Sequence, residues 1–237
     1  MKVLITSGGT KVYIDPIRSI SNMATGKFGS KLAKEVLFKD HNVIYLTSKE
    51  GKSPFCSTID RLKLTDSESI QKINDQNNFT KKYVKEYIEH RYDSYYEYST
   101  ILKESITKYN PDIIILTAAV SDYTVTNFSN NKIKSTNSCT IKLNKAPKVI
   151  NDIKQMHPNV FLVGFKLLID SSEKDLVDAA KNIMRSSKAD IIVANNLSSL
   201  KKGKHEIILL EKNGFYEKIT NNLPFMVINK IFKRFDI

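Results

Sequence analysis

Short runs of apolar residues alternate with longer segments of helical periodicity along this chain. Val3–Thr6 is β-branched and aliphatic and stops at the sequence SGGT, which predicts a buried first strand that ends in a glycine turn. Lys27–Phe38 then carries apolar side chains at helical spacing behind Thr25, which we expect to cap the helix. The order strand, loop, helix is typical of an α/β protein.

The same alternation continues to the C-terminus. Further strands are predicted at Asn42–Thr47, Arg61–Thr65, Asp112–Val120, Phe161–Phe165 and Asp190–Ala194. A helical pattern from Leu176 to Met184 separates the last two, so the chain predicts a doubly wound, mostly parallel sheet. Two alternating runs around Lys212–Gly214 predict an antiparallel hairpin at the edge of that sheet, and a terminal helix follows from Asn221.

Two segments break this pattern. Phe79–Asn110 has helical spacing and many tyrosines interleaved with basic residues, which would suit stacking on nucleic-acid bases. Its six basic residues face five acidic ones, however, which favours a near-neutral pair of helices packed on the sheet or on a second subunit. Thr124–Ser138 is polar and lacks periodicity directly after the most apolar strand, so it is either a mobile strap over a ligand site or a plain surface loop.

Length and composition limit the protein class. A chain of 237 residues can bury one sizeable core, and we expect a single domain over residues 1–237. The sequence shows no secretory signal and no apolar run long enough to span a bilayer, so a cytoplasmic protein without a membrane partner is expected. The net charge of +12 comes mainly from lysine spread along the chain, which favours a solvated surface over a nucleic-acid footprint.

The connection from Gly8 to Gly29 is the strongest indication of function. About fifteen irregular residues separate the first strand from its helix, where a structural connection needs only about two to six. The dinucleotide fingerprint GxGxxG and the Walker phosphate loop are both absent. Arg18 is one of only five arginines, and Asn22 offers both a donor and an acceptor, so this loop is expected to bind an anionic or acyl-phosphate group.

Five sequence motifs in this order resemble those of the phosphopantothenate cysteine ligases. They are the Gly8–Gly29 loop, TAAVSDY (Thr117–Tyr123), NKIKS (Asn131–Ser135), VGF (Val163–Phe165) and IIVAN (Ile191–Asn195). The resemblance implies a modified Rossmann-like, doubly wound fold and a homodimer. It also implies small-molecule substrates, 4′-phosphopantothenate and L-cysteine, rather than nucleic acid.

The resemblance further implies a two-step reaction. The carboxylate of 4′-phosphopantothenate attacks the α-phosphate of CTP, or ATP, and pyrophosphate leaves. The amine of cysteine then attacks the acyl nucleotide, and the nucleoside monophosphate leaves. Mg²⁺ is expected with the nucleotide, with protein ligands that the motifs do not identify. Because the chain starts at the first strand of the ligase, we expect a stand-alone enzyme without the flavin-dependent decarboxylase domain of many relatives.

The resemblance assigns roles position by position. Arg18 and Asn22 are expected to act on the acyl intermediate, and Lys132 in the strap is expected to neutralise the reacting phosphate. Ala118 and Ala119 match the small pair over which the pantothenate arm passes. Nucleotide contacts are implied for Gly8, Gly9, Gly26, Gly29, Asp122, Phe165, Lys181, Arg185 and Asn195.

Departures from the family pattern leave the choice of nucleotide open. Ala24 replaces a serine and Lys148 replaces an aspartate of the family, so the choice between CTP and ATP is not decided. An NADPH-dependent reductase on a related fold and a basic nucleic-acid binding module are alternatives. The first is motivated by the glycine turn and the second by the charge of +12, but neither explains Asn22 together with Lys132.

Overall fold

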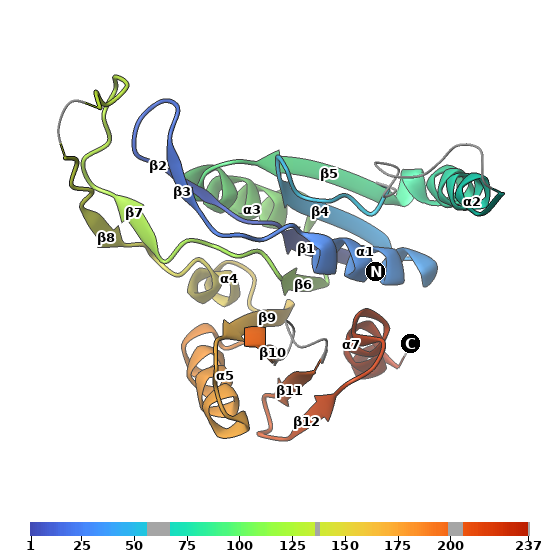
Figure 1. Ribbon diagram of the computed structural model, residues 1–237. Coiled ribbons are helices and arrows are strands. Elements are labelled where there is room, and N and C mark those ends of the chain that lie inside the picture. The colour runs from blue at the N-terminus through green and yellow to red at the C-terminus, as the bar shows by residue number, and fades with distance from the viewer. Residues whose placement is uncertain (56–66, 136–137, 199–205, 237) are drawn as a thin grey trace.

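The computed structural model describes residues 1–55, 67–135, 138–198 and 206–236, and within these ranges it contains one eight-stranded sheet between two layers of helices (Figure 1). The strands are β1 (Lys2–Ser7), β4 (Asn42–Ser48), β5 (Tyr87–Tyr92), β6 (Ile113–Leu116), β9 (Phe161–Leu168), β10 (Ile191–Asn196), β11 (Ile207–Glu211) and β12 (Tyr216–Ile219). Their order across the sheet is β12-β11-β10-β9-β6-β1-β4-β5.

The direction in which the strands are added reverses beside β1. From β1 the chain continues to β4 and β5 on one side, then returns to place β6, β9 and β10 on the other, all in parallel. β11 and β12 follow as an antiparallel hairpin at the edge. The predicted doubly wound sheet with a C-terminal hairpin is therefore confirmed. In such sheets ligands bind beyond the carboxyl ends of the strands at the reversal, here between β1 and β6.

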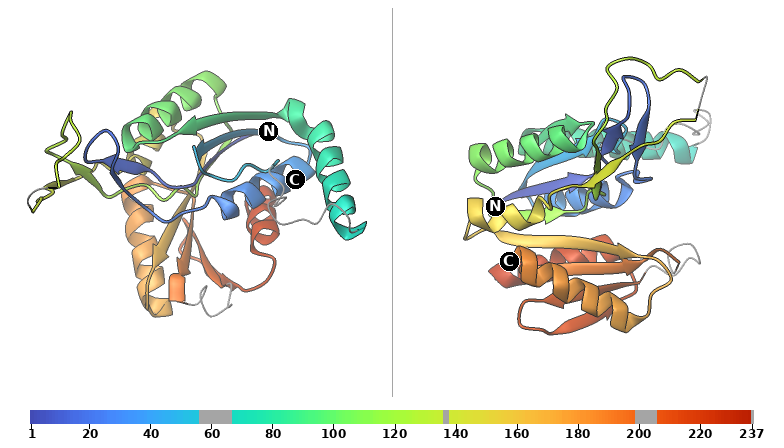
Figure 2. Two further views of the ribbon diagram at one scale, coloured as in Figure 1. Left: turned by 45° about the horizontal axis from the view of Figure 1, so that its top comes forward. Right: turned by 90° about the vertical axis from the view of Figure 1, so that its left-hand side faces the viewer.

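Helices cover both faces of the sheet (Figure 2). One layer contains α1 (Lys27–Phe38) and α7 (Leu223–Phe232), with α2 (Ser67–Tyr83) beside α1, and the other contains α3 (Tyr95–Tyr109), α4 (Ile150–Met156) and α5 (Glu173–Ser187). Single 3-10 turns occupy Val84–Glu86 and Lys233–Phe235. No helix in the described ranges has the length and apolarity that a membrane crossing requires.

Helix α1 has the predicted bounds but a different start. Its apolar positions at helical spacing, including Leu32 and Val36, are fully buried against the sheet. The prediction that Thr25 caps this helix is wrong, because the N-cap is Gly26 in a left-handed conformation without a side-chain cap. The Thr25 hydroxyl accepts a long hydrogen bond of 3.4 Å from the Lys27 N–H.

The expectation of a helical pair over Phe79–Asn110 is half wrong. α3 does pack on the sheet, but Tyr87–Tyr92 forms the edge strand β5 rather than a helix. The run YIEHRY places apolar residues at spacings that fit both a helix and a half-buried strand, and pairing with β4 decides in favour of the strand. The strand predicted at Arg61–Thr65 lies outside the described residues.

An arm of two small sheets extends beyond the main sheet (Figure 1). The Gly8–Gly29 connection is not wholly irregular, because it contains the hairpin β2 (Lys11–Tyr13) and β3 (Ser19–Ser21). After β6, which ends four residues earlier than the predicted strand, β7 (Tyr123–Val125) pairs with β8 (Leu143–Lys145). We call residues 11–21, 123–135 and 138–145 the arm.

Candidate active site

The loops that follow β1 and β6 meet through the backbone of Ala119. The Ala119 N–H donates to the Gly8 carbonyl at 2.8 Å, and the Ala119 carbonyl accepts from the Thr10 N–H at 3.2 Å. The side-chain amide of Asn22 donates to the same carbonyl at 2.9 Å. The structure therefore brings together the glycine turn, Asn22 and the small pair Ala118 and Ala119 at the reversal of the sheet.

The N-terminus of α1 packs closely against the same turn. A Cβ on Gly29 would lie 2.4 Å from Ser7 Oγ and 2.7 Å from Thr117 Oγ1, and one on Gly26 would lie 3.3 Å from the Gly8 nitrogen. A Cβ on Gly9 would be 2.8 Å from the Asn22 carbonyl oxygen. The first turn of α1 holds no acidic side chain, so no residue of that turn offsets the positive end of the helix, which suits anion binding at this corner.

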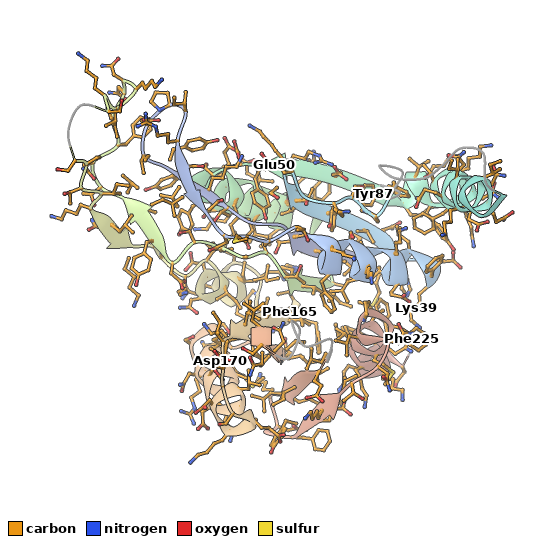
Figure 3. The ribbon with its side chains drawn as sticks, in the orientation of Figure 1. Lys39, Glu50, Tyr87, Phe165, Asp170 and Phe225 are labelled. Atoms are coloured by element: carbon orange, nitrogen blue, oxygen red, sulfur yellow. The ribbon has the colours of Figure 1, made fainter. Side chains whose placement is uncertain are left out.

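Phe165 and Asn195 lie on adjacent strands near the carboxyl end of the sheet. Phe165 pairs in register with Val193, two residues before Asn195, so alternation places Phe165 and Asn195 on the same face. On that face the ring of Phe28 from α1 contacts Phe165 edge to face, with centroids 5.7 Å apart. Figure 3 shows Phe165 at the centre of the molecule. Sequence reasoning used Phe28 only as an apolar helix position and missed this pairing.

Asp122 follows the small pair and forms an ion pair with Lys148. The Lys148 ammonium contacts the Asp122 carboxylate directly, and both side chains are about half exposed. The Asp122 carbonyl also accepts from the Ala146 N–H at 2.9 Å, which joins the two segments through the backbone. Lys148, one of the departures from the family pattern, therefore places a positive charge beside the expected nucleotide contact.

Lys181 and Arg185 lie apart from this corner. Both are in the second half of α5, which starts at Glu173, just after the carboxyl end of β9, and runs back along the sheet. At 1.5 Å per residue they lie about 12 Å and about 18 Å from the start of the helix. The structure does not bring them to the glycine turn, and their contact with a triphosphate stays a prediction.

Arg18 and Lys132 form a second group, at the tip of the arm. Arg18 Nη2 donates to the carbonyl of Ile133, the residue after Lys132, at 3.2 Å. Strand β3 separates Arg18 from Asn22, and four extended residues span about 13 Å. The three expected catalytic residues are thus divided between the arm tip and the glycine turn of one chain.

An ionic cluster around the buried Asp93 fixes the base of the arm to the sheet. The carboxylate of Asp93, just after β5, contacts Lys11 Nζ at 2.9 Å and Lys49 Nζ at 3.4 Å, and accepts from the Tyr13 hydroxyl at 2.6 Å. Burial alone would raise the pKa of Asp93, but the hydrogen bonds from Tyr13 and Lys11 and the nearby positive charge outweigh it, and the pKa is lowered. No sequence pattern indicated this cluster, because its members are far apart in the chain.

Curated relatives cover most of this chain. It is 29% identical over 98% of its length to the "Coenzyme A biosynthesis bifunctional protein CoaBC" of Thermococcus kodakarensis, and spans 49% of that protein. It is 27% identical over 90% of its length to "Phosphopantothenate--cysteine ligase 2" of Oryza sativa subsp. japonica, and spans 72% of it. The chain therefore spans about half of the bifunctional relative and most of the rice protein.

Solved structures agree with the fold. The "DNA/Pantothenate Metabolism Flavoprotein" from Streptococcus pneumoniae is 26% identical, with a TM-score of 0.79 and 99% of both chains covered. A Cab2 variant solved with phosphopantothenate-cysteine is 20% identical, with a TM-score of 0.86 over 99% of this chain and 86% of that one. These neighbours have the same doubly wound sheet, and the modified Rossmann-like fold implied by the motifs is confirmed.

One family model matches nearly the whole chain. The model described as "DNA/pantothenate metabolism flavoprotein C-terminal domain" matches residues 1–82 and 97–234. The interruption falls between the end of α2 and the start of α3, where the structure places β5. The chain belongs to the DNA/pantothenate metabolism flavoprotein C-terminal domain family.

Proposed function

We propose that this chain joins 4′-phosphopantothenate to L-cysteine through an acyl nucleotide made from CTP or ATP, a step of coenzyme A biosynthesis. The observation that carries the proposal is the meeting of the glycine turn, Asn22 and the small alanine pair on the backbone of Ala119. The name of the rice relative, of which the chain spans 72%, supports it independently.

The site suits the chemistry of carboxylate activation. The carboxylate oxygen of 4′-phosphopantothenate forms a bond to the α-phosphorus while the bond to pyrophosphate breaks. The cysteine amine then attacks the acyl carbon and loses a proton as the nucleoside monophosphate leaves. Both reactants of the first step are anions, so neutralisation and positioning are the main requirements. The N-terminus of α1 beside Gly8, whose first turn holds no acidic side chain, supplies positive potential for the phosphates.

Asn22 is oriented for the acyl intermediate. Its amide has two N–H donors and one carbonyl acceptor, and the contact with Ala119 uses one N–H. That contact fixes which end of the amide faces the loop after β6, where the substrate arm would pass over the small pair. We assign Asn22 the task of holding the acyl oxygen while the amine attacks.

Mg²⁺ would reach the site on the nucleotide itself. Across the described residues, no three His, Cys, Asp or Glu side chains gather so that they could hold a metal ion. Mg²⁺ commonly keeps several waters and uses substrate phosphates as ligands, and in that role it would offset the charge of the triphosphate.

We also infer that the enzyme is a homodimer in which each arm completes the partner's site. Arg18 and Lys132 lie at the arm tip, about 13 Å along the chain from Asn22. The arm exposes large apolar side chains that a second copy would bury, at Ile17, Ile20, Tyr123, Phe128 and Leu143. We expect this dimer to act in the cytoplasm, where nucleoside triphosphates are available.

The two alternatives, a reductase and a nucleic-acid binding module, do not explain the contacts of Asn22 and of the glycine turn. Hydride transfer from NADPH does not need an amide donor fixed beside a pair of alanines, and nucleic-acid binding gives no reason for the closely packed glycine turn. A reductase would oxidise NADPH with carbonyl substrates, which can be followed by absorbance alongside the ligase assay. Neither alternative is favoured by a contact in the described structure.

Release of pyrophosphate tests the proposal directly. Purified protein with 4′-phosphopantothenate, cysteine, Mg²⁺ and CTP should release pyrophosphate, and a parallel reaction with ATP should show which base is preferred. Reactions without 4′-phosphopantothenate provide the control for simple nucleotide hydrolysis. If neither nucleotide yields pyrophosphate above this control, the ligase assignment is wrong.

Two variants divide the reaction and test the shared site. Lys132→Gln should block pyrophosphate release, and Asn22→Asp should permit it but slow amide formation, because the carboxylate loses the N–H that holds the acyl oxygen. Single-turnover assays with and without cysteine separate the steps. Mixing equal amounts of the two impaired variants should raise amide formation to up to about a quarter of the normal rate if Lys132 serves the partner's site, because about half of the dimers are then mixed and each mixed dimer has one intact site of two. Full activity in both variants would refute the assigned roles.

A further inference from the structure

Asp15 is a buried carboxylate at the tip of the β2–β3 hairpin, and no motif assigned it a role. Its side chain is fully buried although the residues around it are partly exposed. Oδ1 accepts from the backbone N–H of Ile17 at 2.9 Å and of Arg18 at 2.8 Å. This oxygen therefore shapes the turn of the hairpin.

The second oxygen of Asp15 reaches a segment 118 residues away. Oδ2 accepts from the backbone N–H of Ile133 at 3.2 Å and lies 3.4 Å from Arg18 Nη1. The Arg18 guanidinium in turn donates from Nη2 to the Ile133 carbonyl at 3.2 Å. Asp15 and Arg18 together thus hold both backbone polar groups of Ile133, an arrangement that we call the Ile133 clasp.

The Ile133 clasp and a second backbone contact fix the strap on both sides of one exposed lysine. Four residues before Ile133, the Ser129 N–H donates to the Ile14 carbonyl at 3.1 Å, so the hairpin holds the strap at two points. Lys132 lies between them with its side chain exposed to solvent. The strap is therefore attached through its backbone, which leaves the ammonium of Lys132 available for a ligand.

The ionised form of Asp15 is the one that suits this arrangement. Burial raises the pKa of the carboxyl, but the N–H groups of Ile17, Ile133 and Arg18 and the Arg18 charge outweigh it, and the pKa is lowered. A neutral side chain could not accept from three N–H groups and also pair with the guanidinium. The contacts of Oδ2, with the Ile133 N–H at 3.2 Å and with Arg18 Nη1 at 3.4 Å, would weaken first, because they are longer than those of Oδ1.

We propose that Asp15 is a positioning residue for the ligase reaction, which holds Ile133 so that Lys132 points at the reacting phosphate. This inference rests on the proposed function for the identity of the reaction, but not for the geometry of the clasp. Displacement of a catalytic group by about 1 Å can cost about a hundredfold in rate. Loss of the clasp should therefore act on the step that uses Lys132.

The variant Asp15→Asn distinguishes the roles of the two carboxylate oxygens of Asp15. Its amide oxygen can still accept from Ile17 and Arg18, but its NH₂ group then faces the Ile133 N–H and the guanidinium. We expect pyrophosphate release in single turnovers to fall at least tenfold, with a change of less than about threefold in the KM for the nucleotide.

In the double variant with Lys132→Gln, Asp15→Asn should add no further loss, because both changes remove the same function. Lys134→Gln, an exposed lysine on the other side of Ile133, is the matched control and should retain normal activity.

Ile133→Pro provides a second route if Asp15→Asn fails to fold. It removes the N–H that donates to Oδ2 while Asp15 and the hairpin turn stay intact. It should reproduce the loss of pyrophosphate release. Normal pyrophosphate release in both variants, or a multiplied loss in the double variant, would overturn the positioning role.

A measurement without substrate keeps the clasp testable if the ligase assignment fails. In Asp15→Asn, amide hydrogen exchange over residues 129–135 should become at least about tenfold faster, while exchange in α1 stays unchanged. Unchanged exchange in the strap would overturn the clasp itself. Faster exchange together with an inactive wild-type protein would refute only the proposed reaction.

Discussion

Replacing Gly8 by alanine tests whether the glycine turn is as tightly constrained as the structure implies. Gly8 has φ of 82°, a left-handed conformation that a residue with a Cβ adopts at a cost of about 1–2 kcal/mol. The added Cβ would lie 2.2 Å from Ser48 Oγ, 2.9 Å from Ser48 Cβ and 3.1 Å from the Ser48 nitrogen. The hydroxyl can rotate away, but the other two atoms move only if the end of β4 shifts.

The expected destabilisation follows from these two terms. Overpacking against an ordered backbone costs about 1–3 kcal/mol, so Gly8→Ala should lower the free energy of unfolding by about 2–5 kcal/mol in total. For a chain of this size about 1 kcal/mol corresponds to about 2–4 °C, which gives a decrease in Tm of roughly 4–20 °C. Ser48→Gly removes both side-chain atoms of Ser48 but leaves its nitrogen 3.1 Å from the added Cβ, so in that background the cost of Gly8→Ala should fall while staying above the left-handed term alone.

Gly214→Ala is the matched control. Gly214 has φ of 89°, and a Cβ there would meet no atom within 4 Å, so only the backbone term of about 1–2 kcal/mol applies. Urea unfolding of the wild type, the two single variants and the Ser48→Gly pair gives each free energy. If Gly8→Ala costs no more than Gly214→Ala, or if Ser48→Gly relieves none of the cost, the close contact between the turn and β4 is refuted.

The remaining predictions concern two ion pairs. Asp93 has a lowered pKa, so the stability it contributes is present above about pH 4 and is lost as the pH falls through the lowered value. Asp93→Asn should therefore lower the unfolding free energy at pH 7 and have a smaller effect at pH 3, and equal effects in urea unfolding at the two pH values would contradict this. Lys148→Ala should change stability by less than about 0.5 kcal/mol, because Lys148 and Asp122 are both about half exposed and solvent screens their attraction. A larger loss in the same assay would show that the pair is structural.

Local patterns predicted the elements whose stability is local. The apolar run Val3–Thr6 and the helical spacing of Lys27–Phe38 gave β1 and α1 almost residue for residue, because each buries one continuous apolar face. Tyr87–Tyr92 was misread because a six-residue edge strand offers too few alternations to exclude a helix, and its pairing with β4 depends on residues about 44 positions earlier.

The site could be predicted in composition but not in arrangement. Motifs in the sequence indicated Asn22, Arg18 and Lys132, yet their division between the glycine turn and the arm tip follows from the hairpin β2–β3, which is held by backbone pairing of short polar strands. The contact of Asp15 with Ile133 joins residues 118 positions apart and leaves no pattern in either segment. Such long-range polar contacts require the folded chain.

The contacts of the arm with the main sheet lie at its base, at the bridge between Lys11 and Ser94 and at the Asp93 cluster, whereas the described hydrogen bonds of its tip are made within the arm. Segments with few ties to a core open at a lower free energy than the core itself. Mild heat or low denaturant would then release the arm tip while the eight-stranded sheet stays folded. Inactivation of this protein would precede its melting, and a thermal scan of the core would overstate the temperature range over which it works.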